Sequence, residues 1–223
     1  MLDLVRGFYD NTLRDILPKK YRVFAGVAVY DGPILDITST KSYYKEGLLT
    51  AITEHVNEGD EVELVGFGRG VSTVYALSAG AAKVTAHEAA AEMIEIGKHT
   101  VDVNRTGDGK LEVRHSIVGE GIDIYGDGKQ AEPIPPSELS FADILVLDCE
   151  GAEKSILSGL GNQPETIICE THPEKGVPAE DTIAAIGEGY QITTRAYEPD
   201  NDTPEGKVVV IATRESSNWI RRR

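Results

Sequence analysis

The stretch from Glu61 to Glu88 constrains the fold more than any other part of the chain. It reads EVELVGFGRGVSTVYALSAGAAKVTAHE: an apolar strand, three glycines at alternate positions, a helical segment and a second strand that ends on an acid. Glycines let the backbone approach a ligand closely, and the N-terminus of the following helix offers N–H groups. The order predicts a nucleotide half-site in which Gly66, Gly68 and Gly70 form the turn and Glu88 meets ribose hydroxyls.

Strand and helix patterns then alternate to the end of the chain, which predicts a mostly parallel sheet with helices on both faces. Three further strands are expected at Leu111–His115, Phe141–Asp148 and Glu165–Thr171, and Gly126–Pro136 reads as a surface loop. Two late strands joined by a polar turn, Tyr190–Ala196 and Lys207–Thr213, predict an antiparallel hairpin at the sheet edge.

The first 57 residues have a different pattern. Apolar positions at helical spacing predict a helix that Pro18 ends, and Asp31-Gly32-Pro33 predicts the turn of a β-hairpin. We expect residues 1–57 to form a cap of helix and hairpin, residues 58–215 the cofactor-binding domain, and residues 216–223 a C-terminal tail.

The composition of the chain limits which kinds of protein and partner are expected. The chain has 223 residues, of which 40% are hydrophobic, enough for one packed domain. No apolar run is long enough to cross a membrane and no leader opens the chain, so a cytoplasmic protein without a membrane partner is expected. Cys149 and Cys169 fall in predicted buried strands and read as core thiols rather than a disulfide.

The net charge of −15 comes from 37 acids and 22 bases. Such a field repels phosphate backbones, so the sequence predicts a small-molecule substrate and no nucleic acid; the oligomeric state is undetermined. An acidic surface also suits a high-salt environment.

Polar residues gather where the predicted strands end, which is where open α/β sheets bind ligands. Asp148 and Glu150 flank Cys149 at one strand end, so both should point to the same side. Such a pair can hold a cationic group, a divalent ion or a substrate hydroxyl, and either acid can instead cap the following helix. Glu170 and His172 repeat the spacing, and His172 can take a proton from a hydroxyl or be a hydrogen-bonded structural residue.

The glycine spacing separates two cofactor classes. Val71 stands where a dinucleotide fingerprint has its third glycine, which favours S-adenosylmethionine over NAD. An NAD(P)-dependent oxidoreductase remains an alternative, since it also uses a glycine turn and a terminal acid.

Four segments together resemble the FkbM family of S-adenosylmethionine-dependent methyltransferases: LVGFGRG, VTAHE, ADILVLDCEGAEKSIL and TIICETHP. The resemblance implies a Rossmann-like class I methyltransferase fold with a mostly parallel seven-stranded sheet and an antiparallel last strand. It also implies methyl transfer to a hydroxyl oxygen of a small molecule or sugar. The acidic composition looks haloarchaeal.

The resemblance also assigns roles to residues. The glycine turn with Phe67 would cradle the cofactor, Glu88 would bind its ribose and Ser116 would lie near its adenine, with Asp148 also a cofactor contact. The catalytic groups would be Asp148, Glu150, Glu170 and His172. No metal is assigned, although a divalent ion is conceivable beside Asp148 and Glu150.

Three positions depart from the family pattern. Leu64 replaces an acid that should anchor the amino-acid end of the cofactor, Val146 replaces a lysine, and Ala89 replaces a proline. Asp148 or Glu46 could substitute for the missing anchor. The departures leave a non-catalytic cofactor-binding module as a further alternative.

Overall fold

The structure is a computed structural model that describes residues 12, 16–35, 40–104, 107–119, 128, 130–140, 142–197 and 205–214. Most of the predicted N-terminal helix and the predicted tail 216–223 lie outside these residues. The strands are β1 Lys19–Phe24, β2 Val27–Pro33, β3 Thr40–Lys41, β4 Glu61–Val65, β5 Lys83–Glu88, β6 Lys110–Val118, β7 Glu132–Ile134, β8 Ile144–Leu147, β9 Thr166–Glu170, β10 Tyr190–Ala196 and β11 Val208–Arg214. The α-helices are α2 Glu46–His55, α3 Val71–Ser78, α4 Ala91–Asn104, α5 Glu153–Gly159 and α6 Ala179–Ile186, and short 3₁₀ turns cover Pro136–Glu138 and Pro173–Lys175.

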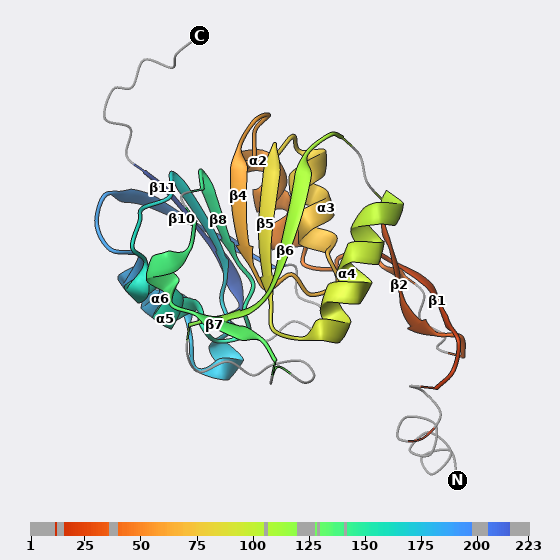
Figure 1. Cartoon of the computed structure of the whole chain (residues 1–223). Helices are drawn as coiled ribbons and strands as arrows, with labels where there is room; N and C mark the ends of the chain where they lie inside the picture. Colours follow the sequence, from red (N-terminus) through yellow and green to blue (C-terminus); the bar gives the residue numbers. More distant parts are fainter. Residues whose placement is uncertain are drawn as a thin grey trace.

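The main sheet has the strand order β10-β11-β9-β8-β4-β5-β6-β7 (Figure 1). Strand β11 inserts between β9 and β10 and runs antiparallel to both, whereas β4, β5, β6, β8 and β9 pair in parallel. The predicted fold class is therefore confirmed: the sheet is mostly parallel, and β11, the last strand in the sequence, runs antiparallel near one edge. The order changes direction between β8 and β4, and such a reversal opens a crevice at the carboxyl ends of the strands.

Two apolar cores lie on opposite faces of the sheet because strand side chains alternate. One core contains Leu64, Val146 and Ile168 with helices α2, α3 and α4. The other contains Val65, Leu147 and Cys169 with helices α5 and α6. Within the described part of the chain, no helix is long and apolar enough to span a bilayer. Cys149 and Cys169 are free and buried, and burial raises the pKa of both thiols well above the usual range.

The N-terminal hairpin turns at a different place from the predicted Asp31-Gly32-Pro33. Strands β1 and β2 pair directly across Ala25 and Gly26, whose φ angles of 46° and 80° are both positive. Two central residues with positive φ suit the twist of a tight hairpin, so the chain reverses there although Ala25 is not a typical turn residue. Asp31 and Gly32 lie within β2 instead. The hairpin packs beside α4, at the edge of the molecule (Figure 1).

A second difference concerns the predicted loop Gly126–Pro136. Residues Glu132–Ile134 form the short strand β7, which pairs in parallel with Ser116–Val118 of β6 and adds an eighth strand to the expected seven. Proline at position 133 obscures this strand in the sequence, since proline is tolerated only at sheet edges. Strand β7 is the edge strand here.

Candidate active site

A cavity of about 640 Å³ lies at the carboxyl ends of β4, β5, β6, β8 and β9. It is also lined by residues 40–45, just before α2, and by Tyr197 and Lys207 near β10 and β11. Of the predicted cofactor residues, Gly66, Phe67, Gly68, Glu88, Ser116 and Asp148 line it. Of the predicted catalytic residues, Asp148, Glu150 and Glu170 line it. Gly70 and His172 are not among the described lining residues.

The three glycines of the turn have two different roles. A Cβ on Gly66 would lie 1.9 Å from the carbonyl oxygen of Asp148, and a Cβ on Gly70 would lie 2.6 Å from that of Gly97 in α4. These two glycines let the turn contact its neighbours directly. A Cβ on Gly68, where φ is +50°, would meet no described atom within 4 Å. Gly68 therefore exposes backbone to the cavity, as a site that holds a ligand against the main chain requires.

Phe67 is among the residues that line the cavity, although it also belongs to the buried core. The side chain is buried, and a Cβ on Gly97 would meet its ring at 2.3 Å. Gly97 is therefore the residue that lets α4 pass close over the glycine turn. Helix α3 begins after Gly70, and among the described residues no side chain caps its N-terminus.

Glu88 is held between the glycine turn and the start of α4. Its Oε2 accepts a hydrogen bond from the Gly68 N–H at 2.7 Å, and its Oε1 accepts one from the Ala90 N–H at 2.9 Å. The second bond is made to the residue directly before α4. Each carboxylate oxygen retains further acceptor capacity, so the same side chain can also bind a pair of hydroxyls.

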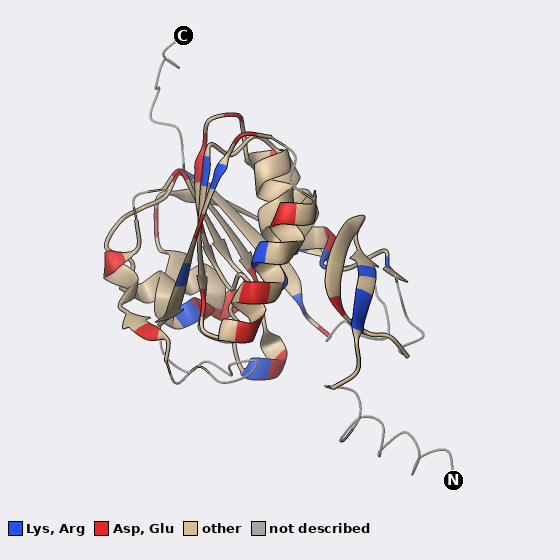
Figure 2. Ribbon diagram, turned by 45° about the vertical axis from the view of Figure 1, so that its right-hand side comes forward, with Lys and Arg blue, Asp and Glu red and all other residues tan. Residues whose placement is uncertain are grey.

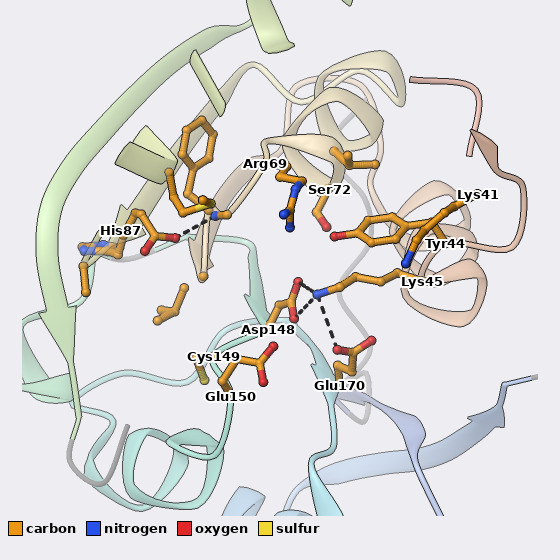
Figure 3. Close-up of a pocket in the computed structure, with 18 of the residues that line it drawn as sticks. Lys41, Tyr44, Lys45, Arg69, Ser72, His87, Asp148, Cys149, Glu150 and Glu170 are labelled. Atoms are coloured by element: carbon orange, nitrogen blue, oxygen red, sulfur yellow. Dashed lines mark hydrogen bonds and ion pairs between the residues drawn. The ribbon is translucent and has the colours of Figure 1, made fainter. Parts of the chain in front are cut away.

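A lysine that the sequence reading did not single out occupies the centre of the site. Lys45 Nζ lies 2.5 Å from both carboxylate oxygens of Asp148 and 3.5 Å from Glu170 Oε2 (Figure 3). Lys207 Nζ lies 2.9 Å from the same Glu170 oxygen, and the Tyr197 hydroxyl donates to the other. The cluster therefore joins the segment before α2 to the ends of β8 and β9.

The pKa values of Asp148 and Glu170 shift in opposite directions. Burial raises the pKa of Asp148 to about 7, Lys45 opposes the rise and Glu170 adds to it. Burial also disfavours ionised Glu170, but Lys45, His172 and Lys207 together hold its pKa well below the usual range. Asp148 is therefore the acid that exchanges a proton near neutral pH, while Glu170 stays ionised.

The hairpin and the glycine turn both contact Tyr44, the residue before Lys45. Lys45 has a left-handed backbone with φ of 48°, a conformation that non-glycine residues rarely adopt. The preceding Tyr44 stacks on Phe24 of β1 with ring centroids 4.9 Å apart. Asp31 of β2 forms ion pairs with Arg69 in the glycine turn and with Arg22 in β1. Backbone strain of this kind persists where the surroundings impose it, and such positions cluster at functional sites.

His172 lies beneath the cavity as a buried ion-pair partner. Its Nδ1 lies 2.5 Å from Glu153 Oε1, and its Nε2 lies 3.3 Å from Glu170 Oε2. Burial disfavours the charged ring, but the two glutamates raise its pKa to about 9. A protonated imidazole cannot accept a proton, so the predicted role of His172 as a base does not fit this environment. Burial and charge pairing decide whether His172 is protonated, and neither can be read from the strand-end motif.

The raised pKa of His172 predicts a pH dependence of stability. Folding favours the protonated ring, so its contribution is full below pH 6.5 and is lost as the pH rises through about 9. We expect urea unfolding to show the stability advantage of wild type over His172→Asn falling by about 3 kcal/mol between pH 6 and pH 10. A difference that stays constant between pH 6 and 10 would contradict this assignment. His99→Asn, at an exposed α4 position, is the matched control.

The capping alternative for Asp148 and Glu150 is not observed. The N-cap of α5 is Ala152, without a side-chain cap, and within the described residues it is Glu153 that bonds the Gly151 N–H. Glu150 has φ of 51° and leaves the strand geometry, yet its carboxylate still lines the cavity below Asp148 (Figure 3).

Glu46 does not replace the acid that is missing at position 64. It is exposed and is not among the described residues that line the cavity. Leu64 is fully buried in the core on the helix α2 side. Asp148 is the acid that the structure brings beside the turn, since its backbone contacts Gly66.

The acids of this cluster are arranged around a lysine. Ligand atoms of Asp148, Glu170 and His172 lie within 4.8 Å of one another, close enough to share a cation. Lys45 already binds the two carboxylates, and the raised pKa of His172 leaves no lone pair on its ring at neutral pH. The donor set as arranged fits an ammonium group better than a divalent metal.

Comparisons with known proteins agree with this architecture. No protein-family model matches the chain, and no curated protein sequence matches it. Among solved structures, the chain is similar to the tRNA (uracil-54, C5)-methyltransferase of Pyrococcus abyssi in complex with S-adenosyl-L-homocysteine, with a TM-score of 0.56 and 18% identity over 89% of this chain and 44% of that chain. It is also similar to the magnesium protoporphyrin IX methyltransferase of Synechocystis with bound SAM, with a TM-score of 0.52 and 15% identity over 76% of this chain and 77% of that chain.

A third similar structure is the ribosomal protein L11 methylase of Lactobacillus delbrueckii subsp. bulgaricus, with a TM-score of 0.52 and 13% identity over 79% of this chain and 80% of that chain. At these identities the likeness concerns the fold. The chain has the Rossmann-like α/β fold of class I S-adenosylmethionine-dependent methyltransferases.

The exclusion of nucleic acid as a partner is wrong. A structure with this fold is named as a tRNA methyltransferase and another as a ribosomal protein methylase, so the fold serves macromolecular as well as small substrates. The argument from net charge fails because charge is not spread evenly. Strand β1 carries Lys19, Lys20 and Arg22 on the hairpin (Figure 2), and Lys45 and Lys207 lie in the cavity.

Proposed function

We propose that this chain is an S-adenosylmethionine-dependent methyltransferase that methylates an oxygen, with Asp148 as the proton acceptor. The single observation that carries the proposal is the buried carboxyl of Asp148, whose pKa is about 7, at the cavity end of β8. A group with a pKa near the operating pH is best suited to remove a proton from a hydroxyl.

The residues present fit the cofactor. Gly68 leaves room for a ligand against the backbone, and the fixed carboxylate of Glu88 offers acceptors for two hydroxyls. When bound, S-adenosylmethionine supplies a methyl group activated by a positively charged sulfonium. Lys45 and Lys207 offset the charges of Asp148 and Glu170, and the Glu150 carboxylate below Asp148 favours a positive group in this part of the cavity.

The chain's own residues would prepare the acceptor oxygen. Asp148 holds Lys45 through both oxygens, but a carboxylate has about four lone-pair sites, so capacity for a hydroxyl remains. Glu170 stays ionised and holds Lys45 and Lys207 in place. Tyr44 and Tyr197 line the same part of the cavity and would contact the body of the acceptor.

Membership of the FkbM family and an acceptor hydroxyl on a small molecule or sugar are the finer parts of the proposal. They are supported by the motif DCEGAE, which supplies Asp148 and Glu150, and by ETHP, which supplies Glu170. The acceptor is tested by transfer of a labelled methyl group to fractionated cell extract, with sugars and RNA as separate fractions. Label only on nitrogen would overturn the oxygen assignment.

Calorimetric titration separates the proposal from the nicotinamide alternative. We expect S-adenosylhomocysteine to bind purified protein and NADH not to bind. Binding of NADH alone would refute the proposal. Binding of S-adenosylhomocysteine without methyl transfer to any fraction would favour a non-catalytic module.

Glu88→Gln is expected to weaken S-adenosylhomocysteine binding about tenfold or more, because hydrogen bonds to a charged acceptor are the stronger ones. Calorimetry of the dissociation constant checks this. Glu92→Gln is the matched control, since Glu92 lies nearby in the first turn of α4 but is exposed and pairs with Lys19. Equal affinities of the two variants would argue against Glu88 as the ribose ligand.

A further inference from the structure

Four basic side chains line the cavity of this acidic chain. Among the described lining residues, the bases are Lys41, Lys45, Arg69 and Lys207. They come from the segment before α2, from the glycine turn and from the position directly before β11. Arg69, Lys41 and Lys45 lie on the opposite side of the cavity from His87 (Figure 3). The whole chain has 37 acids against 22 bases, so a gathering of positive charge here runs against its composition.

Lys207 lies on the same side as Lys45, because the two lysines share one carboxylate. Glu170 Oε2 lies 3.5 Å from Lys45 Nζ and 2.9 Å from Lys207 Nζ. Asp148 supplies a second negative charge, since both of its oxygens contact Lys45. Two lysines are therefore matched by two acids, and this cluster has no negative charge left over.

The glycine turn adds a positive charge that no acid balances within the described contacts. Asp31 is 4% exposed and forms ion pairs with both Arg69 and Arg22, so one carboxylate serves two guanidinium groups. The cofactor does not remove this surplus. Its amino-acid end carries one charge of each sign, and its sulfonium is balanced by Glu150 in the arrangement proposed above. With the cofactor bound, the acceptor side of the cavity therefore stays positive.

Lys207 is fixed in a position from which it can bind a ligand. Its side chain is 15% exposed, and its Nζ lies 6.0 Å from the centre of the Tyr197 ring. The Tyr197 hydroxyl donates to Glu170, so the ring, the carboxylate and the ammonium hold one another in place. An ammonium has three hydrogens, and a single Glu170 oxygen cannot accept all of them. Lys207 therefore keeps hydrogen-bond donors for a negatively charged ligand.

These features suit an acceptor that carries an acid beside its reactive hydroxyl. We propose that the acceptor is a small hydroxylated acid and that Lys207 binds its anionic group, a carboxylate or a phosphate. Hydrogen bonds between such charged partners are roughly twice as strong as neutral ones, and the surplus charge at Arg69 attracts an anion to this side. Glu170 is a positioning residue, because it acts through Lys207. The inference rests on the proposed function, since it names the acceptor class of that reaction.

The first test sorts cell extract by charge before the reaction. Polymers are removed by ultrafiltration, and the small molecules are passed over an anion-exchange resin. Each pool is then incubated with wild-type protein and labelled S-adenosylmethionine. We expect the label mainly in the pool that the resin retains, on a product that is still negatively charged. Label mainly in the flow-through or in the polymers would overturn the inference. So would a product that has lost its charge, because the acid itself would then have taken the methyl group.

Phosphatase treatment distinguishes the two sources of the anionic group. A labelled phosphate monoester should lose its retention on the resin after treatment, whereas a labelled carboxylic acid should keep it. Either result supports the shared chemistry and identifies the acid that Lys207 binds.

The second test compares the purified acceptor with a neutral derivative, made by amidation of a carboxylate or by removal of a phosphate. We expect the derivative to raise KM for wild type at least about tenfold, because it removes a hydrogen bond between two charged groups. The value of kcat should change less than about threefold, since this contact is the same in the ground state and the transition state. Equal KM values for the two compounds would overturn the inference.

Variants separate binding of the acid from support of Glu170. Lys207→Met should show nearly the same KM for the acid and its neutral derivative, and Lys207→Arg should restore the preference. If Lys207 only held Glu170, Lys207→Met would raise KM equally for both compounds and leave the preference intact, which would contradict the inference. Lys154→Met is the control and should keep the wild-type preference, since Lys154 also pairs with one carboxylate, Asp181 at 2.8 Å, but is 57% exposed on α5.

The outcomes also separate this inference from the proposed function. If no pool accepts label, the proposed function fails. If label reaches a hydroxyl oxygen of a neutral molecule, only the role of Lys207 fails. The comparison of the acid with its neutral derivative needs no variant, so it remains decisive even where a substitution prevents folding.

Discussion

Replacing Asp148 by asparagine is expected to lower kcat for methyl transfer by about 100-fold or more, because a positioned general base contributes about 10²- to 10⁴-fold. The base acts as the carboxylate. With a pKa of about 7, wild-type activity should therefore rise with pH, pass its midpoint near 7 and level off above it. The variant should lose both the activity and this inflection. Steady-state kinetics between pH 5.5 and 9 measure the two effects together.

Lys45→Met provides the companion experiment. The Lys45 ammonium lowers the pKa of Asp148, so its removal should move the midpoint of the pH–rate profile to a higher pH. Titration with S-adenosylhomocysteine verifies that both variants still fold and bind. An Asp148→Asn enzyme within threefold of wild type, or a Lys45→Met profile with an unmoved midpoint, would exclude Asp148 as the base.

Replacing Gly66 by alanine is expected to destabilise the protein by at least about 3 kcal/mol. The new Cβ would lie 1.9 Å from the Asp148 carbonyl oxygen, and both residues directly follow the paired strands β4 and β8. Neither can withdraw without breaking the sheet, and φ at position 66 is +97°, which alanine also disfavours. Urea unfolding at pH 7 checks the value, and failure to obtain folded protein is the extreme form of the same result.

Gly59→Ala separates the steric effect from the conformational one. Gly59 has a similar φ of +92°, but a Cβ there would meet no described atom within 4 Å. Only backbone strain remains, about 1 to 2 kcal/mol. If the two variants lose equal stability, then close packing of the turn against Asp148 is not what requires glycine at position 66.

The sequence identified the elements that are specified by residues close together in the chain. The glycine turn, the apolar strands and the helices that alternate with them are encoded by local backbone preference and by periodicity. The hairpin turn was misplaced because Ala25-Gly26 lies inside an apolar run, while Asp31-Gly32-Pro33 has typical turn residues. Strand β7 was missed because it is short and contains a proline.

The candidate site was predictable in its outline, since parallel strands bring their carboxyl ends to one edge. Asp148, Glu150 and Glu170 meet at the cavity as that rule requires. The rule did not apply to His172, because the strand ends at Glu170 and the next residues turn the imidazole under the cavity. Lys45 could have been suspected from Tyr43 and Tyr44, which directly precede it. No nearby residue indicates that it pairs with Asp148 and Glu170.

The sequence by itself determined where the backbone must turn, which faces are apolar and which residues stand at the strand ends. The tertiary structure alone decided which groups carry charge. Lys45 and Asp148 are 103 residues apart in the chain, and Glu170, at the end of β9, contacts lysines from two other segments. Proton affinity depends on burial and on charges within a few ångströms, whichever part of the chain supplies them. The glycine turn is therefore encoded in its own residues, whereas the chemistry beside it depends on folding.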